Sequence, residues 1–111
     1  MSEIIYVLTN KTMPGLCKIG HTQSLNERLR NLSGQTGVPL PFECFYAKRV
    51  DKNAQEVEKW LHELFDDNRI NPRKEFFEIS PQKVVLALQP YSGREILLKQ
   101  MLRFMHLIFL E

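Results

Sequence analysis

Glu58 and His62 form a pair of residues whose types and spacing could do chemistry. They lie four positions apart in a stretch whose apolar residues recur every three or four positions, as on one face of a helix. Residues at this spacing project from the same face, so we expect the carboxylate beside the imidazole. Such a pair can be an ion pair, part of a metal site, or two neighbours with no shared role.

Tyr6 and Arg28 are two further candidates. Tyr6 stands among aliphatic residues of a predicted strand, where a tyrosine ordinarily packs its ring in the core while its hydroxyl reaches a polar partner. Arg28 follows Leu25 by three positions and precedes Leu29 by one, at the margin of an apolar helical stripe. It can be a surface arginine whose stem covers the core, or a planar fork that binds a phosphate.

The stretch "LCKIGHTQSLNERLRNL" crowds Lys18, Gly20, His21 and Thr22 around one predicted turn. A strand-to-helix turn needs a glycine and a cap, but it does not need a lysine, a histidine and a threonine as well. In a strand, Lys18 and Gly20 face one side and Ile19 the other, so Ile19 can join the core. Gly20 would then allow close approach of a phosphate backbone.

These candidates need a sheet and flanking helices to position them. β-Branched and aromatic runs predict strands over residues 3–10, 16–20, 42–50 and 75–79, the first two joined by a loop of about five or six residues. We therefore expect an α+β fold, a small antiparallel sheet of three to four strands flanked by helices. Residues 1–80 would form the main domain and residues 81–111 a helical extension.

Capping signals mark the expected helix starts. They are the Ser24–Glu27 capping box, Asp51 as a cap, Ser80 before Pro81, and the Ser92–Glu95 capping box.

The last predicted helix carries a wide apolar stripe. It can cover an open side of the sheet, or residues 94–110 can form a homodimer contact or bind another protein. Its charged residues argue against a membrane span.

Composition sets the remaining bounds. The chain has 111 residues, of which 43% are hydrophobic and 25% charged, and a formal net charge of +2. This charge permits a DNA partner without indicating one. Cys17 and Cys44 lie in apolar surroundings, which favours free thiols in a cytoplasmic protein over a disulfide. The first residues show no secretory pattern.

The order and spacing of these motifs resemble the GIY-YIG nuclease superfamily over about residues 3 to 80. The family's two signature triplets correspond to Ile4-Ile5-Tyr6 and Lys18-Ile19-Gly20, followed here by Thr22 and a helix bearing Arg28. The pattern "KIG.T", "E..LH" and "E.F" is most similar to the phage-associated branch of that superfamily.

The resemblance implies a metal-dependent DNA endonuclease. Glu58 would hold one divalent cation, Mg²⁺ or Mn²⁺, and Arg28 would grip the phosphate. Tyr6 would orient or deprotonate the attacking water, with Lys18 and His21 assisting. Gly20, Thr22 and His62 would contact the substrate.

Three positions depart from the family pattern or compete within it. Lys18 replaces the second tyrosine, which keeps a catalytically weak or inactive module, binding nucleic acid or protein, as the alternative. Glu75 in "EFFEI" is a secondary candidate for the carboxylate role, although it matches a structural glutamate of the motif. Asn71 is a secondary candidate for the asparagine that commonly follows the metal-binding glutamate.

Overall fold

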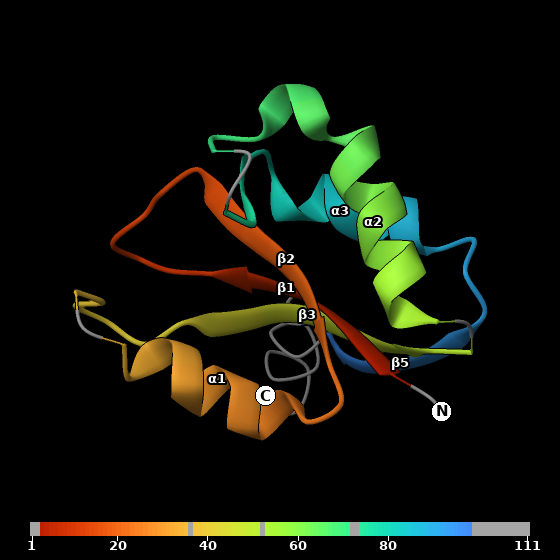
Figure 1. Ribbon diagram of the computed structural model, residues 1–111, viewed down its shortest axis with the longest axis horizontal. Helices are drawn as coiled ribbons and strands as arrows, with labels where there is room; N and C mark the ends of the chain where they lie inside the picture. The colour runs from red at the N-terminus through yellow and green to blue at the C-terminus, as the bar shows by residue number, and fades with distance from the viewer. Residues whose placement is uncertain (1–2, 36, 52, 72–73, 99–111) are drawn as a thin grey trace, which may run out of the picture.

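The computed structural model describes residues 3–35, 37–51, 53–71 and 74–98. Its centre is a five-stranded antiparallel sheet in the order β4-β2-β1-β3-β5 (Figure 1). The strands are β1 (Glu3–Thr9), β2 (Leu16–Thr22), β3 (Glu43–Val50), β4 (Phe76–Glu78) and β5 (Gly93–Leu98). The helices are α1 (Leu25–Ser33), α2 (Ala54–Leu64), the short 3-10 helix η1 (Asp66–Asn68) and α3 (Pro81–Leu88). The predicted α+β class is confirmed, with one strand more than expected.

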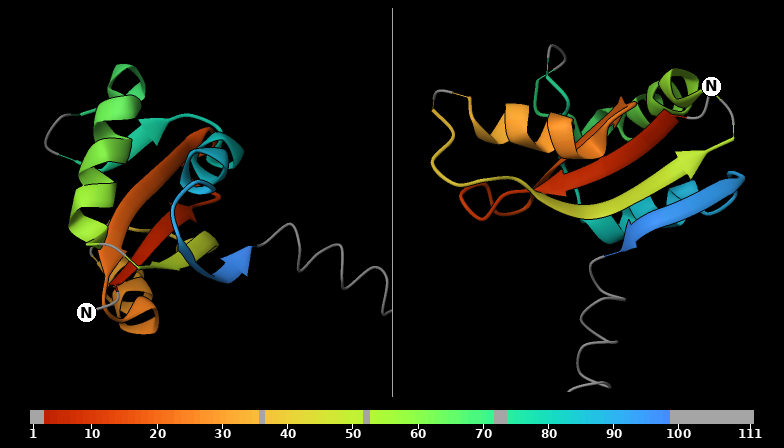
Figure 2. Two further views of the ribbon diagram at one scale, coloured as in Figure 1. Left: turned by 90° about the vertical axis from the view of Figure 1, so that its right-hand side faces the viewer. Right: turned by 90° about the horizontal axis from the view of Figure 1, so that it is seen from below.

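Helices cover both faces of the sheet. Figures 1 and 2 show α1 on one face and α2 with α3 on the other. The central strand β1 has five consecutive buried residues, Ile4 to Leu8, because apolar layers lie on both sides of it. Ile5 and Val7 pack with the α2–α3 layer, whereas Tyr6 and Leu8 pack with the α1 layer.

Local sequence signals place the first elements correctly. The β1–β2 hairpin has a six-residue loop and pairs Tyr6 with Gly20 across the strands. Helix α1 begins after Ser24, and its predicted stripe packs on the sheet, with Leu32 buried and Leu25 and Leu29 partly buried.

Two helix caps differ in detail from expectation. The Ser24 side chain makes no capping hydrogen bond, so the predicted capping box does not form. Helix α2 is capped by Asn53, whose side-chain oxygen accepts a hydrogen bond from the Gln55 N–H at 2.9 Å, and not by Asp51. Asn is as good a cap as Asp, and Asn53 directly precedes the buried Ala54.

The predicted last helix is wrong over residues 93–98, which form β5. Gly93 brings the chain so close to β3 that a Cβ atom there would lie 2.3 Å from the Arg49 carbonyl oxygen. Pairing with the outer edge of β3 supplies hydrogen bonds that a local capping box cannot outweigh. The predicted contact region 94–110 therefore starts as a strand, and residues 99–110 lie outside the described part of the chain.

Two interior features complete the fold. Cys17 and Cys44 are free thiols, as predicted, and burial raises their pKa to about 12 and about 11. Lys48 is buried and donates hydrogen bonds to the carbonyl oxygens of Leu88 at 3.1 Å and Tyr91 at 2.5 Å, which ties β3 to the end of α3. Among the described residues, no helix has the length and apolar character needed to cross a bilayer.

Candidate active site

The candidate site lies where the edge of β2 is open. Strand β4 pairs only with Leu16, Cys17 and Lys18, and the next contact is the hydrogen bond from the Ile19 N–H to the Glu75 carbonyl oxygen at 3.2 Å. Within the described part of the chain, no strand pairs with residues 20–22 on this side. Side chains from α1, from α2 and from the segment just before β4 lie there instead.

Tyr6 reaches this edge by lying across Gly20. A Cβ atom on Gly20 would lie 2.3 Å from the Tyr6 hydroxyl oxygen and 2.4 Å from the ring carbon that carries it. The missing side chain of Gly20 thus makes room for the tyrosine ring, so we correct the expectation that it makes room for a phosphate. Position 20 must therefore have no side chain, because the Tyr6 ring occupies that space.

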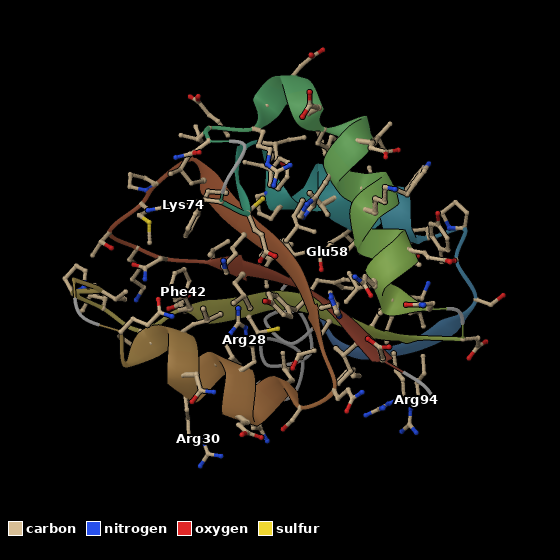
Figure 3. The ribbon with its side chains drawn as sticks, viewed as in Figure 1. Arg28, Arg30, Phe42, Glu58, Lys74 and Arg94 are labelled. Atoms are coloured by element: carbon tan, nitrogen blue, oxygen red, sulfur yellow. The ribbon has the colours of Figure 1, made fainter. Side chains whose placement is uncertain are left out.

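Arg28 meets Tyr6 at this point. The Arg28 Nε–H donates a hydrogen bond to the Tyr6 hydroxyl oxygen at 3.3 Å. Figure 3 shows Arg28 directed from α1 toward the sheet, whereas Arg30 on the same helix points away from it. Burial raises the pKa of Tyr6, and the hydrogen bond from Arg28 opposes this only in part. Tyr6 therefore stays protonated at neutral pH, and its oxygen accepts the Arg28 hydrogen bond.

Glu58 approaches the same edge from α2, on the other side of β2 from α1 (Figure 3). Its side chain is only 13% exposed. The Oε2 atom lies 3.4 Å from His21 Nε2, close enough for an ion pair, but among the described residues it has no partner with hydrogen-bond geometry. Glu3 holds the His21 ring in this orientation: a Glu3 carboxylate oxygen lies 3.2 Å from His21 Nδ1 and accepts a hydrogen bond from it.

His62 also lies beside Glu58, as the helical spacing predicts. Its Nε2 is 3.6 Å from Glu58 Oε1 and 3.0 Å from the Ile19 carbonyl oxygen. A carbonyl only accepts, so Nε2 carries a hydrogen and donates it to Ile19. Burial lowers the pKa of His62, which keeps the ring neutral at neutral pH. His62 thus closes part of the open edge of β2.

Lys18 has a partner of its own. Its ammonium nitrogen lies 3.3 Å from Glu75 Oε2 and 5.0 Å from the centroid of the Phe76 ring, and the residue is 9% exposed. Lys18 is therefore held by a carboxylate and an aromatic ring at the place where the resemblance expects a tyrosine.

Two carboxyl groups, Glu58 and Glu75, share this small volume. Burial and, after it, the adjacent Glu75 raise the pKa of Glu58 to about 8, while Lys18 and Arg69 oppose the shift. A buried carboxyl group with an unpaired oxygen is a group that a cation would stabilise. The donor set for a metal is narrow, since among the described residues no three His, Cys, Asp or Glu side chains converge as a metal-binding group. Glu58 fits a metal held by one carboxylate and otherwise by water and substrate.

Two other predicted residues have different surroundings. The Thr22 hydroxyl donates to the Ser24 carbonyl oxygen and accepts from the Ser24 N–H, each at 3.2 Å, so it shapes the turn into α1. Asn71 accepts a backbone hydrogen bond from the Lys74 N–H at 2.9 Å in the loop before β4.

Sequence reasoning missed Glu3 and Arg69. Arg69 lines, with Glu58 and His62, a hollow of about 820 Å³ along α2. Glu3 could have been found from the hairpin register, which sets Ile5 opposite His21 and Glu3 diagonally next to it. Arg69 carries no signal in the sequence, because it lies eleven positions after Glu58 in a loop.

Comparisons with known proteins give one match. A model of the T5orf172 domain matches residues 3–90. This domain is phage-associated and is related to nuclease-like modules. No curated protein and no solved structure matches the chain.

Proposed function

This chain belongs to the T5orf172 domain family, and we propose that it is a metal-dependent DNA endonuclease with a GIY-YIG-type site. The family is compatible with a nuclease-like or DNA-binding module. The proposal goes further and assigns a reaction, the hydrolysis of a phosphodiester bond, to the open edge of β2. Two free thiols are in keeping with a cytoplasmic setting.

One observation carries the proposal. The Tyr6–Arg28 hydrogen bond and the buried carboxyl group of Glu58 come from three different elements and converge on a single strand edge. These groups match what phosphoryl chemistry needs. The phenol would be a proton donor, the guanidinium would bind the phosphate, and the carboxylate would be a ligand for a cation.

Tyr6 and Arg28 would act on the phosphate as a unit. The Arg28 Nε–H is occupied by Tyr6, so the terminal nitrogens of the guanidinium are the ones available to bind non-bridging oxygens. Because Arg28 donates to the phenol oxygen, the Tyr6 O–H would donate outward, to a phosphate oxygen or to the attacking water. This favours an orienting role for Tyr6 over the deprotonation that the sequence left open.

Glu58 would hold the divalent cation, Mg²⁺ or Mn²⁺, and His21 and His62 would keep its carboxylate in place. The bound cation would supply charge neutralisation on the phosphate and a template for water and leaving group. Lys18, fixed by Glu75, would add positive charge beside the substrate without accepting a proton.

Nicking of supercoiled plasmid tests the proposal. Purified protein is incubated with plasmid and Mg²⁺ or Mn²⁺, beside Glu58→Ala, Arg28→Ala and a Glu78→Ala control. Glu78 is exposed on β4 and lines neither the site nor the hollow. We expect nicking by the wild type and by Glu78→Ala, and a loss of at least about a hundredfold in the other two variants.

The alternative function gives a different result. Lys18 in place of the second tyrosine favours a module that binds DNA without cutting it. Intact plasmid with every divalent cation, together with binding that weakens steeply as salt rises, would replace the enzyme by this module. Nicking that survives Glu58→Ala would place the activity elsewhere and sink the proposal.

A further inference from the structure

Arg69 is a cation beside Glu58 that the proposed reaction does not yet use. It follows η1, and its backbone N–H donates to the Asp66 carbonyl oxygen at 3.0 Å. The residue forms an isolated bridge with Phe77 of β4. Arg69 is therefore anchored in the backbone on the α2 side of the candidate site.

The Arg69 guanidinium is also held in place. Its Nε–H donates to the Lys74 carbonyl oxygen at 3.1 Å, and its central carbon lies 5.6 Å from the centroid of the Phe77 ring. These contacts remove much of the rotamer freedom that a free arginine would lose on binding an anion. Such an arginine binds a phosphate at a lower entropic cost.

The charge of Arg69 has no acidic partner among the described residues. Lys18 is paired with Glu75, and the Arg28 Nε–H is used by Tyr6, but no ion pair with Arg69 occurs in that part of the chain. Its terminal nitrogens make no hydrogen bond there either. The hollow that it lines holds several carboxylates, and yet none pairs with it.

Arg69 and Arg28 lie on opposite faces of the sheet edge. Arg28 belongs to the α1 face through Tyr6, whereas Arg69 stacks on Phe77, which packs in the α2–α3 layer together with His62. Arg69 also lines the same hollow along α2 as Glu58 and His62. A strand that crosses the site would pass from one guanidinium to the other.

We propose that Arg69 binds a second phosphate of the DNA strand, on the opposite side of Glu58 from the phosphate that Arg28 binds. This inference rests on the proposed function, because it assumes that DNA crosses the open edge of β2. Two fixed guanidiniums would hold the backbone on both sides of the bond to be cut. Arg69 would thus set the register of the strand over Glu58.

The salt dependence of DNA binding tests Arg69 separately from catalysis. Binding of a fluorescent duplex oligonucleotide is measured by anisotropy over a range of NaCl concentrations, in a Glu58→Ala background that cannot turn over. We compare Arg69→Gln, Arg69→Lys and Arg30→Ala in that background. Gln removes the charge but keeps a donor for the Lys74 carbonyl, and Arg30 is the exposed α1 arginine that points away from the sheet.

We expect Arg69→Gln to lower affinity by roughly tenfold and to reduce the slope of log K against log salt by about 0.9, the value for one duplex phosphate contact. Arg69→Lys should keep the slope of its parent, and so should Arg30→Ala. Circular dichroism checks that each variant is folded, and Arg69→Ala replaces the Gln variant if that one is not. If part of a variant were unfolded, the molecules that stay folded would still show the same slope of log K against log salt.

Either of two slope measurements would overturn the inference. One is an unchanged slope in Arg69→Gln, and the other is an equal reduction in Arg30→Ala, which would reflect general charge and not a contact. Absence of any DNA binding in the parent would overturn it as well. If the wild type binds DNA with an Arg69-dependent slope but never nicks plasmid, the inference stands and the nuclease proposal falls.

Discussion

The Tyr6 ring and Gly20 fit together as one unit at the scale of single residues. The ring lies where any side chain on Gly20 would be, and this places the phenol at the strand edge beside Arg28. The glycine of the second signature triplet is thus explained by packing against the tyrosine of the first. This contact joins two positions that are fourteen residues apart in the sequence.

Gly20→Ala should destabilise the protein by roughly 1–3 kcal/mol, because the new methyl group would overlap the Tyr6 phenol. The free energy of unfolding from urea titration measures this change. In a Tyr6→Ala background the same substitution should cost little, because the obstructing ring is gone. An equal cost in both backgrounds would mean that the strain lies in the backbone of β2.

Tyr6→Phe separates the hydroxyl from the ring. The ring still fills the space over Gly20, and the protein loses only the single hydrogen bond from Arg28. We expect a loss of stability of about 1 kcal/mol or less and a fall in the nicking rate of about a hundredfold. Thermal melting and single-turnover cleavage measure the two effects, and a rate near that of the wild type would remove Tyr6 from the reaction.

Glu58 should make the stability of the metal-free protein depend on pH. Its folded pKa is raised from 4.5 to about 8, so between these values the unfolded chain loses a proton that the folded protein keeps. Stability from this group is therefore full at low pH and falls as pH rises toward and through 8. Glu58→Gln should match the wild type near pH 4 and be more stable than it near pH 9.

Melting curves in EDTA across this pH range measure the difference between Glu58→Gln and the wild type. Mg²⁺ added at about pH 8 should then raise the melting temperature of the wild type and not that of the variant, because binding to the folded carboxylate stabilises it. A difference between the two proteins that is constant with pH would show that Glu58 is not perturbed in the folded state.

At the scale of elements, the short strand β4 leaves open the edge of β2 where the candidate site lies. Because β4 pairs with only three residues of β2, the rest of that edge is left to side chains from α1 and α2. The hairpin loop, the α1 start and the Ser80–Pro81 start of α3 follow from local signals, and they were predictable. The position of Glu58 beside His62 was predictable for the same reason, since helical spacing fixes it.

Long-range contacts explain what the sequence could not predict. Strand β5 exists because β3 offers an unpaired edge, which no local pattern in "GREILL" reveals. The pairing of Lys18 with Glu75 likewise joins segments far apart in the chain. Tertiary pairing overrode a good capping box at Ser92.

Gly93→Val should detach β5 from β3. A side chain there would run into the Arg49 carbonyl, which is backbone and cannot move aside as a side chain would. We expect amide protection in β5 and on the β5-facing side of β3 to fall, while amides that join β1 and β2 stay protected. Hydrogen exchange read by NMR measures this, and equal loss in both regions would show that β5 unfolds only with the whole sheet.

At the scale of the whole molecule, β1 joins two apolar layers. Its alternate residues contribute to the α1 layer and to the α2–α3 layer. Both layers therefore pack against the same strand. The stability of the two faces is therefore shared.

We expect the protein to unfold in one cooperative step in urea. The single tryptophan, Trp60, lies on α2 against Tyr91 and reports on one layer, whereas far-UV circular dichroism also reports on α1. The two transitions should coincide, as two-state behaviour requires. A fluorescence change that precedes the loss of ellipticity would show that the α2–α3 layer opens first.

The two native thiols, buried Cys17 and half-buried Cys44, have a practical consequence for labelling. Alkylating reagents react with thiolates, and Cys17 and Cys44 form almost none at neutral pH because their pKa values are about 12 and about 11. A cysteine introduced at an exposed position such as Lys83 would therefore take up a maleimide dye selectively. The native cysteines can therefore stay in place when the protein is labelled on α3.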